Sequence, residues 1–407
     1  MYSAAARSAR PLAVFLLLIA GLAGAGALRA QPAQPPPETP EAWLVTYGPG
    51  DIYWQRFGHN AIWLREPGGL DHTFNFGFFD FEQESFLLRF VQGRMLYFAA
   101  AVPAQQEIAL YRGEGREVRL QRLDLPPGAY ARLREHLLWH VRPENREYLY
   151  DYYLDNCSTR LRDALDLALD GQLAARFGNE PAGQTFRSHT RRSTQADRDY
   201  YLGLVTALGL PVDRPVSRWD EMFLPAVLAD AVRDLEIEGV AGPVPLVSAE
   251  QTLVPGVVTP PPPVPGRTWP FFGLIGTALA VLGLLLARLG PVAGVEGAAL
   301  AWLLITGTLG LGLVLIWAFT DHVMAYPNFN LLLLNPLWVL GVVPALRRFT
   351  AVLVALGAGT AVLVASWPGG QYLADTLALL LPVNLAVAWR LWRCPAPPRR
   401  ARRRFSD

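Results

Sequence analysis

The chain has 407 residues, enough for one or two domains. Its formal net charge at pH 7 is +1, so the bulk charge favours neither an acidic partner nor a nucleic acid, and no nucleic acid is expected as a partner. Hydrophobic residues make up 52% of the chain, but this average combines two unlike halves. Residues 40–250 mix charged, aromatic and aliphatic side chains, as globular domains do, whereas residues 269–391 are almost uncharged.

The N-terminus has the pattern of a secretory signal peptide, which we assign to residues 1–30. Arg7 and Arg10 precede an apolar run, and small residues follow at a cleavage site whose position stays open. The apolar run is short for a membrane span, which favours a signal peptide over an uncleaved anchor. Residues 31–42 are rich in proline and are predicted to form a linker.

Four further parts follow along the chain. They are a mixed-composition domain (43–253), a second proline-rich linker (254–266), a membrane domain (267–392) and a basic tail (393–407). Because about 20 apolar residues cross the hydrocarbon core of a membrane, the membrane domain is predicted to contain five transmembrane helices. These lie near 269–287, 298–319, 329–346, 350–367 and 373–391. Pro336 and Pro344 interrupt the third.

The arginines predict the orientation of these spans. If the N-terminal domain lies outside, then Arg288, Arg347, Arg348 and the basic tail all face the cytoplasm. The outer turns, 320–328 and 367–372, contain no Lys or Arg. This positive-inside pattern predicts a multi-pass membrane protein with an exported N-terminal domain and a cytoplasmic tail.

One cysteine stands alone in the exported domain. This is Cys157, since the second cysteine, Cys394, lies in the predicted cytoplasmic tail. An unpaired exported cysteine is either buried and inert or functional. Asp155 and Asn156 are good N-cap residues, and apolar residues follow at helical spacing. Cys157 is therefore expected in the first turn of a helix, where free N–H groups and the dipole favour a thiolate, the nucleophile of acyl transfer.

A thiol nucleophile needs a base, and His59 is the preferred candidate. It stands just after Gly58 at the start of a predicted strand, and the turn Pro67-Gly68-Gly69 leads to a returning strand. A polar imidazole at a strand start fits a base that faces a cleft. The alternative is an ordinary hydrogen-bonded strand histidine.

The other histidines are weaker candidates. His136 and His140 have the i, i+4 spacing of metal ligands, but no third ligand accompanies them, so no metal site is predicted. His189 lies in a polar stretch and is predicted to belong to a solvated loop. His322 lies in the membrane half.

The base also needs a polar neighbour that fixes its tautomer. If the hairpin centres on the middle glycine of its turn, His59 faces Gly77, and Asn75 is the diagonal neighbour of His59 on the same face. Asn75 is therefore the first choice. His72 and Asp71 are rivals, because register read from sequence is uncertain by a residue or two.

Further polar residues are candidates for oxyanion stabilisation or substrate positioning. Asn156 lies beside the nucleophile, although helix capping is its simpler role, and Tyr53 precedes the histidine strand. A polar cluster is predicted at the outer membrane surface; it consists of Asp321, His322, Asn328 and Asn330. Polar groups at that depth have partners or functions. These four are predicted to contact lipid, to dock the exported domain, or to cap and link helices.

Several segments resemble the Lnb-type bacterial lipoprotein N-acyltransferases. YGPGDIYWQRFGHNAIWL, FNFGFFDF, YDYYLDNCSTRLRDAL and GLPVDRPVSRWDEMFLP resemble the periplasmic domain of that family, and FTDHVMAYPNFNLLLLNPLWVL resembles its membrane domain. The resemblance covers nearly the whole mature chain. It implies an α+β fold, with a permuted NlpC-type, papain-like exported domain similar to that of lecithin:retinol acyltransferase, followed by an all-α membrane domain. In that arrangement the histidine strand precedes the cysteine helix, as His59 precedes Cys157.

The resemblance also implies an activity and its partners. Cys157 matches the nucleophile and His59 the base, while the third position falls within 71–75. In the retinol enzyme that position is a histidine, which favours His72. The implied reaction, in the bacterial inner membrane, transfers a fatty acyl chain from a glycerolipid or phospholipid, through a Cys157 thioester, to the α-amine of a lipoprotein's N-terminal cysteine. No cofactor is implied.

Two other functions remain open from the sequence. One is a membrane-tethered NlpC-type peptidase or amidase that acts on cell-wall peptides, for which five spans are excessive. The other is a scaffold in which Cys157 is structural. The acyl donor, its chain length and the oligomeric state are not determined by the sequence.

Overall fold

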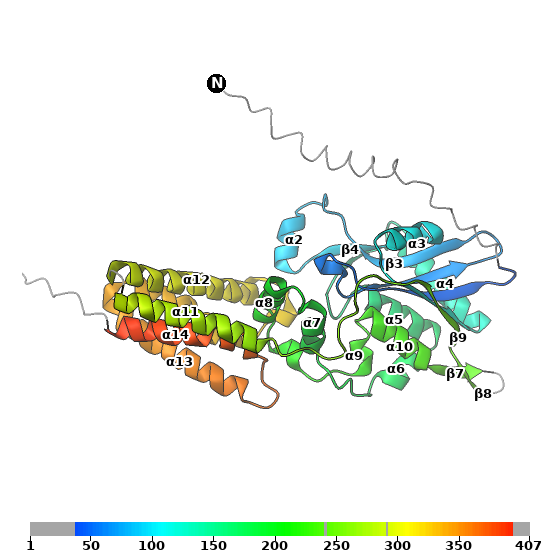
Figure 1. Ribbon diagram of the computed structural model, residues 1–407. Coiled ribbons are helices and arrows are strands. Elements are labelled where there is room, and N and C mark those ends of the chain that lie inside the picture. The colour runs from blue at the N-terminus through cyan, green and yellow to red at the C-terminus, as the bar shows by residue number, and fades with distance from the viewer. Residues whose placement is uncertain (1–36, 240–241, 290–291, 394–407) are drawn as a thin grey trace, which may run out of the picture.

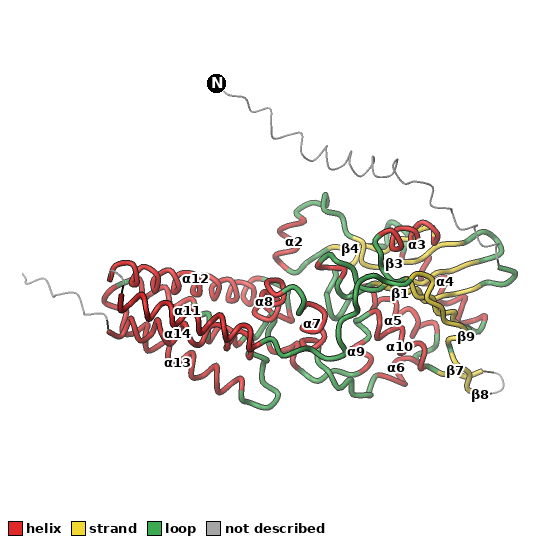
Figure 2. Tube along the Cα trace, viewed as in Figure 1, coloured by secondary structure: helices red, strands yellow, loops and turns green. Residues whose placement is uncertain are grey.

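The computed structural model describes residues 37–239, 242–289 and 292–393. Its N-terminal part is built on a sheet and its C-terminal part is a bundle of long helices (Figure 1). Figure 2 shows the strands gathered in the first part and the long helices in the second. The prediction of an α+β domain followed by a helical membrane domain is confirmed. The predicted signal peptide and Cys394 lie outside the described residues.

The main sheet of the described region has seven strands, in the order β6-β4-β3-β2-β1-β5-β9, and its neighbours are antiparallel. The strands are β1 (Glu41–Tyr47), β2 (His59–Arg65), β3 (Asp71–Phe78), β4 (Leu96–Pro103), β5 (Val118–Leu123), β6 (Glu147–Leu149) and β9 (Val247–Val254). β2 and β3 form the predicted hairpin. Ala61 pairs with Asn75, so the hairpin has the register that a centre at Gly68 predicts.

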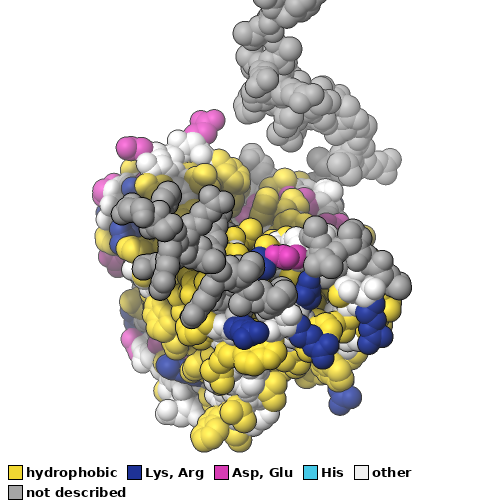
Figure 3. Space-filling view, turned by 90° about the vertical axis from the view of Figure 1, so that its left-hand side faces the viewer, with side chains coloured by type: hydrophobic (Ala, Val, Ile, Leu, Met, Phe, Trp, Pro, Cys, Tyr) yellow, Lys and Arg dark blue, Asp and Glu magenta, His cyan; other side chains and the backbone are white. Residues whose placement is uncertain are grey.

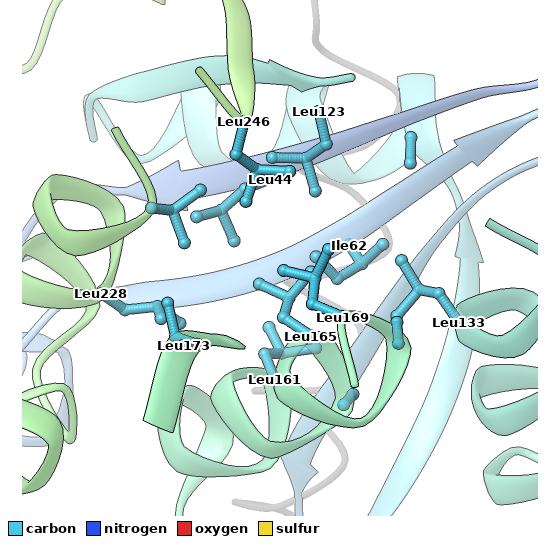
Figure 4. Close-up of a cluster of buried hydrophobic side chains, with 14 of the residues drawn as sticks. Leu44, Ile62, Leu123, Leu133, Leu161, Leu165, Leu169, Leu173, Leu228 and Leu246 are labelled. Atoms are coloured by element: carbon cyan, nitrogen blue, oxygen red, sulfur yellow. The ribbon is translucent and has the colours of Figure 1, made fainter. Parts of the chain in front are cut away.

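Alternation along the strands divides their side chains between two faces of the sheet. On one face, Ile62 packs in the core with Leu165 of α5 (Cys157–Ala168), as Figure 4 shows. On the other face, Ala61 belongs to the cluster that includes α3 (Ala104–Gly113). The hairpin that carries the candidate base therefore lies between the cysteine helix and α3.

The remaining elements of this domain surround that core. They are α2 (Phe86–Gln92), α4 (Pro127–His140), α6 (Gln172–Phe177), α7 (Phe186–Thr194), α8 (Arg198–Ala207), α9 (Arg218–Glu221), α10 (Pro225–Asp234), β7 (Glu236–Gly239) and β8 (Gly242–Pro245). His189 lies in α7, is buried, and has its Nε2 atom 2.5 Å from a carboxylate oxygen of Glu221. The prediction of a solvated loop there is wrong, because Thr185 and Ser188 form a capping box that starts a helix.

Four helices among the described residues are long and apolar enough to cross a membrane. They are α11 (Trp269–Leu289), α12 (Val292–Phe319), α13 (Arg347–Ala365) and α14 (Ala374–Arg393). Many of their outward side chains are large and apolar, for example Leu274, Leu309 and Leu363. Such surfaces are stable in lipid, so the chain is a multi-pass membrane protein.

The third predicted span, 329–346, is not an α-helix, and the prediction of five transmembrane helices is wrong at this point. The segment consists of the 3-10 helices η4 (Phe329–Leu332), η5 (Pro336–Val342) and η6 (Pro344–Leu346). Pro336 and Pro344 lack the N–H that a continuous helix needs at these positions, and each starts a new short helix.

The broken segment nevertheless passes from one end of the bundle to the other. Leu334 lies against Gly310 in the second half of α12, and Arg347 pairs at 2.5 Å with Glu296 near the start of α12. A 3-10 helix rises about 2 Å per residue, so it covers a given distance with fewer residues than an α-helix. The described chain thus crosses the bundle five times, and four of these crossings are α-helical.

Irregular backbone within a membrane needs partners from the protein itself. Asn384, which is buried in α14, donates Nδ2 to the carbonyl oxygen of Leu333 at 3.2 Å and accepts from the indole N–H of Trp302. On α13, Gly357 approaches the carbonyl of Leu332 so closely that a side chain would collide with it. The broken segment is therefore held by α12, α13 and α14.

The arginines predicted to face the cytoplasm lie at the end of the bundle that is remote from the sheet domain. Arg288 is in the last turn of α11, Arg347 begins α13, and Arg390 and Arg393 are in the last turn of α14. Figure 3 looks onto this end of the molecule and shows several basic side chains spread across it. The two ends of the bundle therefore differ in charge in the folded protein.

Candidate active site

The N-terminus of α5 places Cys157 at the first position of the helix. The Oδ1 atom of Asn156 accepts hydrogen bonds from the backbone N–H groups of Ser158 and Thr159, and Thr159 completes a capping box. The Nδ2 group of Asn156 donates to the carbonyl oxygens of Tyr152 and Phe223. The contacts of Asn156 are thus those of an N-cap, and its amide is already occupied within the fold.

Cys157 packs against the hairpin that carries His59. The thiol-bearing residue is 9% exposed, and the backbone N–H of Asn60 is directed at its sulfur. The β2–β3 ladder ends at the pair of Ala61 and Asn75, so Asn60 lies just beyond it. The end of the ladder therefore provides a backbone donor beside the sulfur.

Gly77 makes room for the cysteine. Its φ angle is +96°, in the left-handed region that favours glycine, and β3 has an irregular register between Asn75 and Phe78. A Cβ atom at Gly77 would lie 3.5 Å from the Cβ of Cys157 and 3.7 Å from the ring of Tyr150. Continuing the β2–β3 register by two places sets Gly77 opposite His59. The bare backbone of Gly77 thus lies against the cysteine, opposite the start of the histidine strand.

His59 begins β2 and is held by Asn75. The two side chains meet at 2.9 Å, between Nε2 of His59 and Oδ1 of Asn75. Asn75 uses its Nδ2 group to donate to Glu107 at 3.2 Å and to the carbonyl oxygen of Thr73 at 3.3 Å. Because its Oδ1 atom must then accept, the proton of the neutral imidazole is on Nε2 and Nδ1 is left as the base.

Aromatic rings complete the surroundings of the imidazole. Tyr47 stacks on His59 with 5.9 Å between ring centroids, and Tyr111 stacks on Tyr47 at 3.7 Å. The negative charge of a Cys157 thiolate would reach Tyr111 and contributes to its raised pKa, after burial and Glu107. Tyr111 therefore lies within electrostatic range of the sulfur and 6.3 Å from the imidazole centroid.

Burial keeps both the thiol and the imidazole neutral. It raises the pKa of the Cys157 thiol to about 11, and the N–H groups of Asn60 and Ser158 and the charge of Arg116 offset only part of this rise. It also lowers the pKa of His59 to about 4, although the hydrogen bond that His59 donates to Asn75 acts in the opposite direction. Burial thus favours a thiol and a neutral base, and it outweighs the helix N-terminus, which favours a thiolate.

Sequence reasoning missed Glu107, whereas Tyr148 belongs to the tyrosine-rich stretch just before Cys157 that could line a cleft. Glu107 of α3 is buried behind Asn75, and burial raises its pKa. The Tyr148 hydroxyl is buried without a hydrogen-bond partner among the described residues, and it lies 4.0 Å from where a Cβ of Gly77 would be. Glu107 lies in the first turn of the helix that follows β4, and a glutamate at such a position has no distinctive sequence signal. Tyr148 is one of several tyrosines in its segment.

The rivals of Asn75 lie elsewhere. His72 pairs with Leu64, five residues from the His59 level of the hairpin, or about 16 Å along the strand. Asp71 accepts a hydrogen bond from the indole of Trp63 at 2.6 Å. Tyr53, in the 3-10 helix η1 (Tyr53–Gln55), is 48% exposed and lies 4.8 Å from the ring of Tyr200. None of the three contacts His59 within the described residues.

Two asparagines of the predicted membrane-level cluster join the sheet domain to the bundle. Asn328 and Asn330 are buried, and their Nδ2 groups donate to carbonyl oxygens in the last turn of α8. Those carbonyls have no partner inside the helix, so the asparagines cap α8 from the bundle. Of the predicted alternatives, these contacts fit both docking of the exported domain and helix capping.

Asp321 and His322 contact α2 at the same junction. Asp321 accepts from Arg94 at 2.6 Å, and His322 donates Nε2 to the carbonyl oxygen of Phe90 at 3.1 Å. The His136 and His140 rings lie 4.5 Å apart on α4, away from this junction. The described residues contain no group of three His, Cys, Asp or Glu side chains that could hold a metal ion.

Two family models match the chain. Residues 32–192 match the Lnb N-terminal periplasmic domain, and residues 270–389 match the Lnb transmembrane domain. Neither the curated proteins nor the solved structures contain a match. The two family matches cover more than half of the chain, in the order and with the two-part architecture that the structure has. The chain therefore belongs to the Lnb family.

Proposed function

We propose that the chain is a cysteine-dependent lipoprotein N-acyltransferase. It moves a fatty acyl chain from a glycerolipid ester, through a thioester on Cys157, to the α-amine of the N-terminal cysteine of a bacterial lipoprotein. The observation that carries this proposal is a thiol at a capped helix N-terminus whose sulfur faces the backbone N–H of Asn60. Asn60 directly follows His59, the histidine whose tautomer Asn75 sets. Membership of the Lnb family and the attached membrane bundle support a lipid substrate.

The first half-reaction forms the thioester. Nδ1 of His59 takes the Cys157 proton as the sulfur attacks the ester carbonyl carbon of the lipid. The oxyanion accepts hydrogen bonds from backbone N–H groups at the helix N-terminus and from Asn60, whose N–H already faces the sulfur. Cleavage of the C–O bond leaves the acyl group on sulfur, and the imidazolium returns its proton to the glycerol oxygen.

The second half-reaction forms the amide. The neutral α-amine of the lipoprotein attacks the thioester carbonyl, and His59 takes the proton that the amine loses. Cleavage of the C–S bond releases Cys157 as a thiolate, which recovers the proton from His59. An amine is a better nucleophile than water towards a thioester, and the aromatic, half-buried surroundings of Cys157 limit access of water.

The peptidase alternative fits these surroundings less well. The rings of Tyr148 and Tyr150 lie near the thiol, and α2, which is linked to Tyr150 through the rings of Phe79 and Tyr97, exposes apolar side chains. A groove for a polar cell-wall peptide would need hydrogen-bonding groups along its walls. The aromatic walls therefore support an acyl chain as the ligand.

The arginine distribution supports the proposed orientation. With the basic end of the bundle in the cytoplasm, the sheet domain lies in the periplasm at the outer surface of the inner membrane. Lipoproteins whose N-terminal cysteine is acylated would meet the site on that side. Glycerolipids of the outer leaflet are available at the same level.

The proposal is tested by mass spectrometry of a model lipoprotein's N-terminal peptide. The lipoprotein is isolated from bacteria depleted of their own N-acyltransferase that carry the intact chain or the Cys157→Ala variant. An amide-linked acyl chain with the intact chain alone supports the proposal, and the remaining ester chains identify the donor. A free amine in both strains, with each protein present in the membrane, contradicts it.

A further inference from the structure

Residues 78–92, which we call the interfacial segment, expose much apolar surface. The segment includes α2, none of whose residues is buried, and Leu87 is 72% exposed. Its other exposed large apolar side chains are Phe78, Phe81, Leu88, Phe90 and Val91. Contiguous apolar surface of this kind marks a site that contacts a protein, a ligand or a membrane.

The interfacial segment is fixed to the membrane bundle at the end of α12. The carbonyl oxygen of Gln92 accepts from the backbone N–H of Asp321 at 2.8 Å, in addition to the bond between Phe90 and His322. Gly93 follows with a φ angle of +73°, and a Cβ there would lie 2.9 Å from the backbone nitrogen of His322. Only glycine allows this close approach, so α2 is held at the level where α12 leaves the bundle (Figure 1).

The apolar surface of α2 continues the surface of the bundle. Phe319, the last residue of α12, is 73% exposed, and Trp317 is also exposed. Tryptophan at the end of a membrane helix is typical of the interface between headgroups and acyl chains. Asp80, Glu82 and Glu84, in the same segment, are exposed and disfavour deep insertion. The charge and the position together fit the headgroup region of the leaflet next to the sheet domain.

A row of rings connects α2 with the thiol. Phe86 of α2 lies 6.3 Å from Phe79, Phe79 lies 5.2 Å from Tyr97, and Tyr97 stacks on Tyr150 at 4.2 Å. Tyr150 borders the space at Gly77, next to Cys157. The four rings are only partly buried, so part of each ring is accessible rather than enclosed in the core. An alkyl chain is the ligand that such a row can accept without unpaired polar groups.

We propose that the interfacial segment lies in the headgroup region of the adjacent leaflet and leads one acyl chain of a membrane phospholipid to Cys157 along this row of rings. The inference rests on the proposed function for the reaction at the thiol, but the location of α2 does not depend on it. The ligand of the row of rings is a phospholipid, because the exposed face of α2 is continuous with the lipid-facing surface of α12.

The location is measured by fluorescence quenching. Leu88→Cys is labelled with bimane in a chain that carries Cys157→Ala and Cys394→Ala, in nanodiscs whose phospholipids bear a spin label near the headgroup. The matched control is Leu167→Cys, an exposed position near the end of α5 in the sheet domain. Quenching at position 88 with little at position 167 supports the proposal. Equal, weak quenching at both positions overturns it.

Delivery is measured by intact-protein mass spectrometry of the Cys157 thioester. The double variant Leu87→Asp/Leu88→Asp is compared with Leu167→Asp and with the unaltered chain. Each protein is assayed with two acyl donors, which are phosphatidylethanolamine in lipoprotein-free nanodiscs and soluble p-nitrophenyl butyrate. We expect the double variant to lose at least about tenfold in thioester formation from nanodisc lipid, since each lost leucine contact is worth that much. With the soluble ester, thioester formation by the double variant should differ from that of the unaltered chain by less than about twofold, because the change in α2 leaves the proposed nucleophile and base in place.

Three other outcomes would overturn delivery. Equal losses with both acyl donors would mean that α2 is only structural. A thioester from p-nitrophenyl butyrate but not from nanodisc lipid in the unaltered chain would exclude a phospholipid donor. No thioester from either donor in the unaltered chain would contradict the proposed function itself, while the quenching result would still decide where α2 lies.

Discussion

The side-chain oxygen of Asn75 lies 2.9 Å from Nε2 of His59, and the amide nitrogen of Asn75 donates to buried Glu107. These contacts join β2, β3 and α3, and they set the tautomer of the imidazole from the side of its Nε2 atom. Glu107 orients the amide, the amide orients the ring, and Nδ1 remains free to take a proton. Burial lowers the pKa of His59 to about 4 and keeps the ring neutral, which is the form that the proposed role as a base requires.

Removing the Asn75 amide should disable the base. Asn75→Ala is expected to lower the rate of Cys157 acylation by p-nitrophenyl butyrate by about 100-fold or more, because the imidazole loses the contact that selects its tautomer. His72→Ala is the matched control and should change the rate less than about twofold, since His72 lies near the other end of the hairpin. A large loss in His72→Ala with an active Asn75→Ala would reverse the assignment.

The Cys157 thiol should be unreactive near neutral pH. Its pKa is raised to about 11 by burial, so it is protonated below that pH, and the thiolate fraction grows about tenfold per pH unit. Iodoacetamide alkylation of the Cys394→Ser chain should therefore still be rising between pH 7 and pH 9.5. The same chain unfolded in denaturant should level off above about pH 8.5, as a free cysteine does. A plateau below pH 8 in the folded chain would show that the resting site holds a thiolate.

A side chain at Gly77 should lower both activity and stability, whereas a side chain at Gly69 should lower stability alone. Gly77→Ala adds a methyl group against Cys157 and forces a φ of +96° on alanine, so acylation of Cys157 should fall by about tenfold or more. Gly69→Ala is the control: its φ is +98°, but nothing lies within 4 Å of its Cβ. Both variants should lower the thermal midpoint by a similar amount, corresponding to about 1 kcal/mol. Similar acylation rates in the two variants would argue against a close fit at Gly77.

Asn156 should behave as a cap. Asn156→Ala removes the acceptor for two backbone N–H groups and the donor to two carbonyls, so it should destabilise the sheet domain by about 1–3 kcal/mol. Asn156→Asp keeps the acceptor and should lose less. Thermal unfolding of the full chain in detergent, at one scan rate, compares the two. If Asn156→Asp instead keeps full stability but loses acylation, the amide is an oxyanion donor.

The parts of the site that the sequence predicted are those set by local rules. Asp155 and Asn156 before an apolar stripe predicted the start of α5, and a capping box is present there. The Pro-Gly-Gly turn and the alternating strands predicted the β2–β3 register, and with it the position of Asn75 relative to His59. Similar local signals were misread at His189, where a polar stretch hid a capped helix.

Two membrane-level predictions depended on more than local pattern. An apolar run of 18 residues predicted a helix at 329–346, yet Pro336 and Pro344 break it into 3-10 turns. Asp321, His322, Asn328 and Asn330 were recognised as polar residues at the membrane surface, but their partners were not evident. Those partners, in α2 and α8, are more than 100 residues away in sequence.

The sequence by itself determined the two-part organisation, and it predicted the export signal, the orientation of the spans, and the pair Cys157 and His59 as candidates. Each follows from composition, hydrophobic length or short-range periodicity, which act within a few turns of chain. The tertiary structure alone decided the protonation of that pair, the support of Asn75 by Glu107, and the attachment of α2 to the end of α12. Desolvation and close approach arise only when distant segments pack together, so no window of sequence contains them.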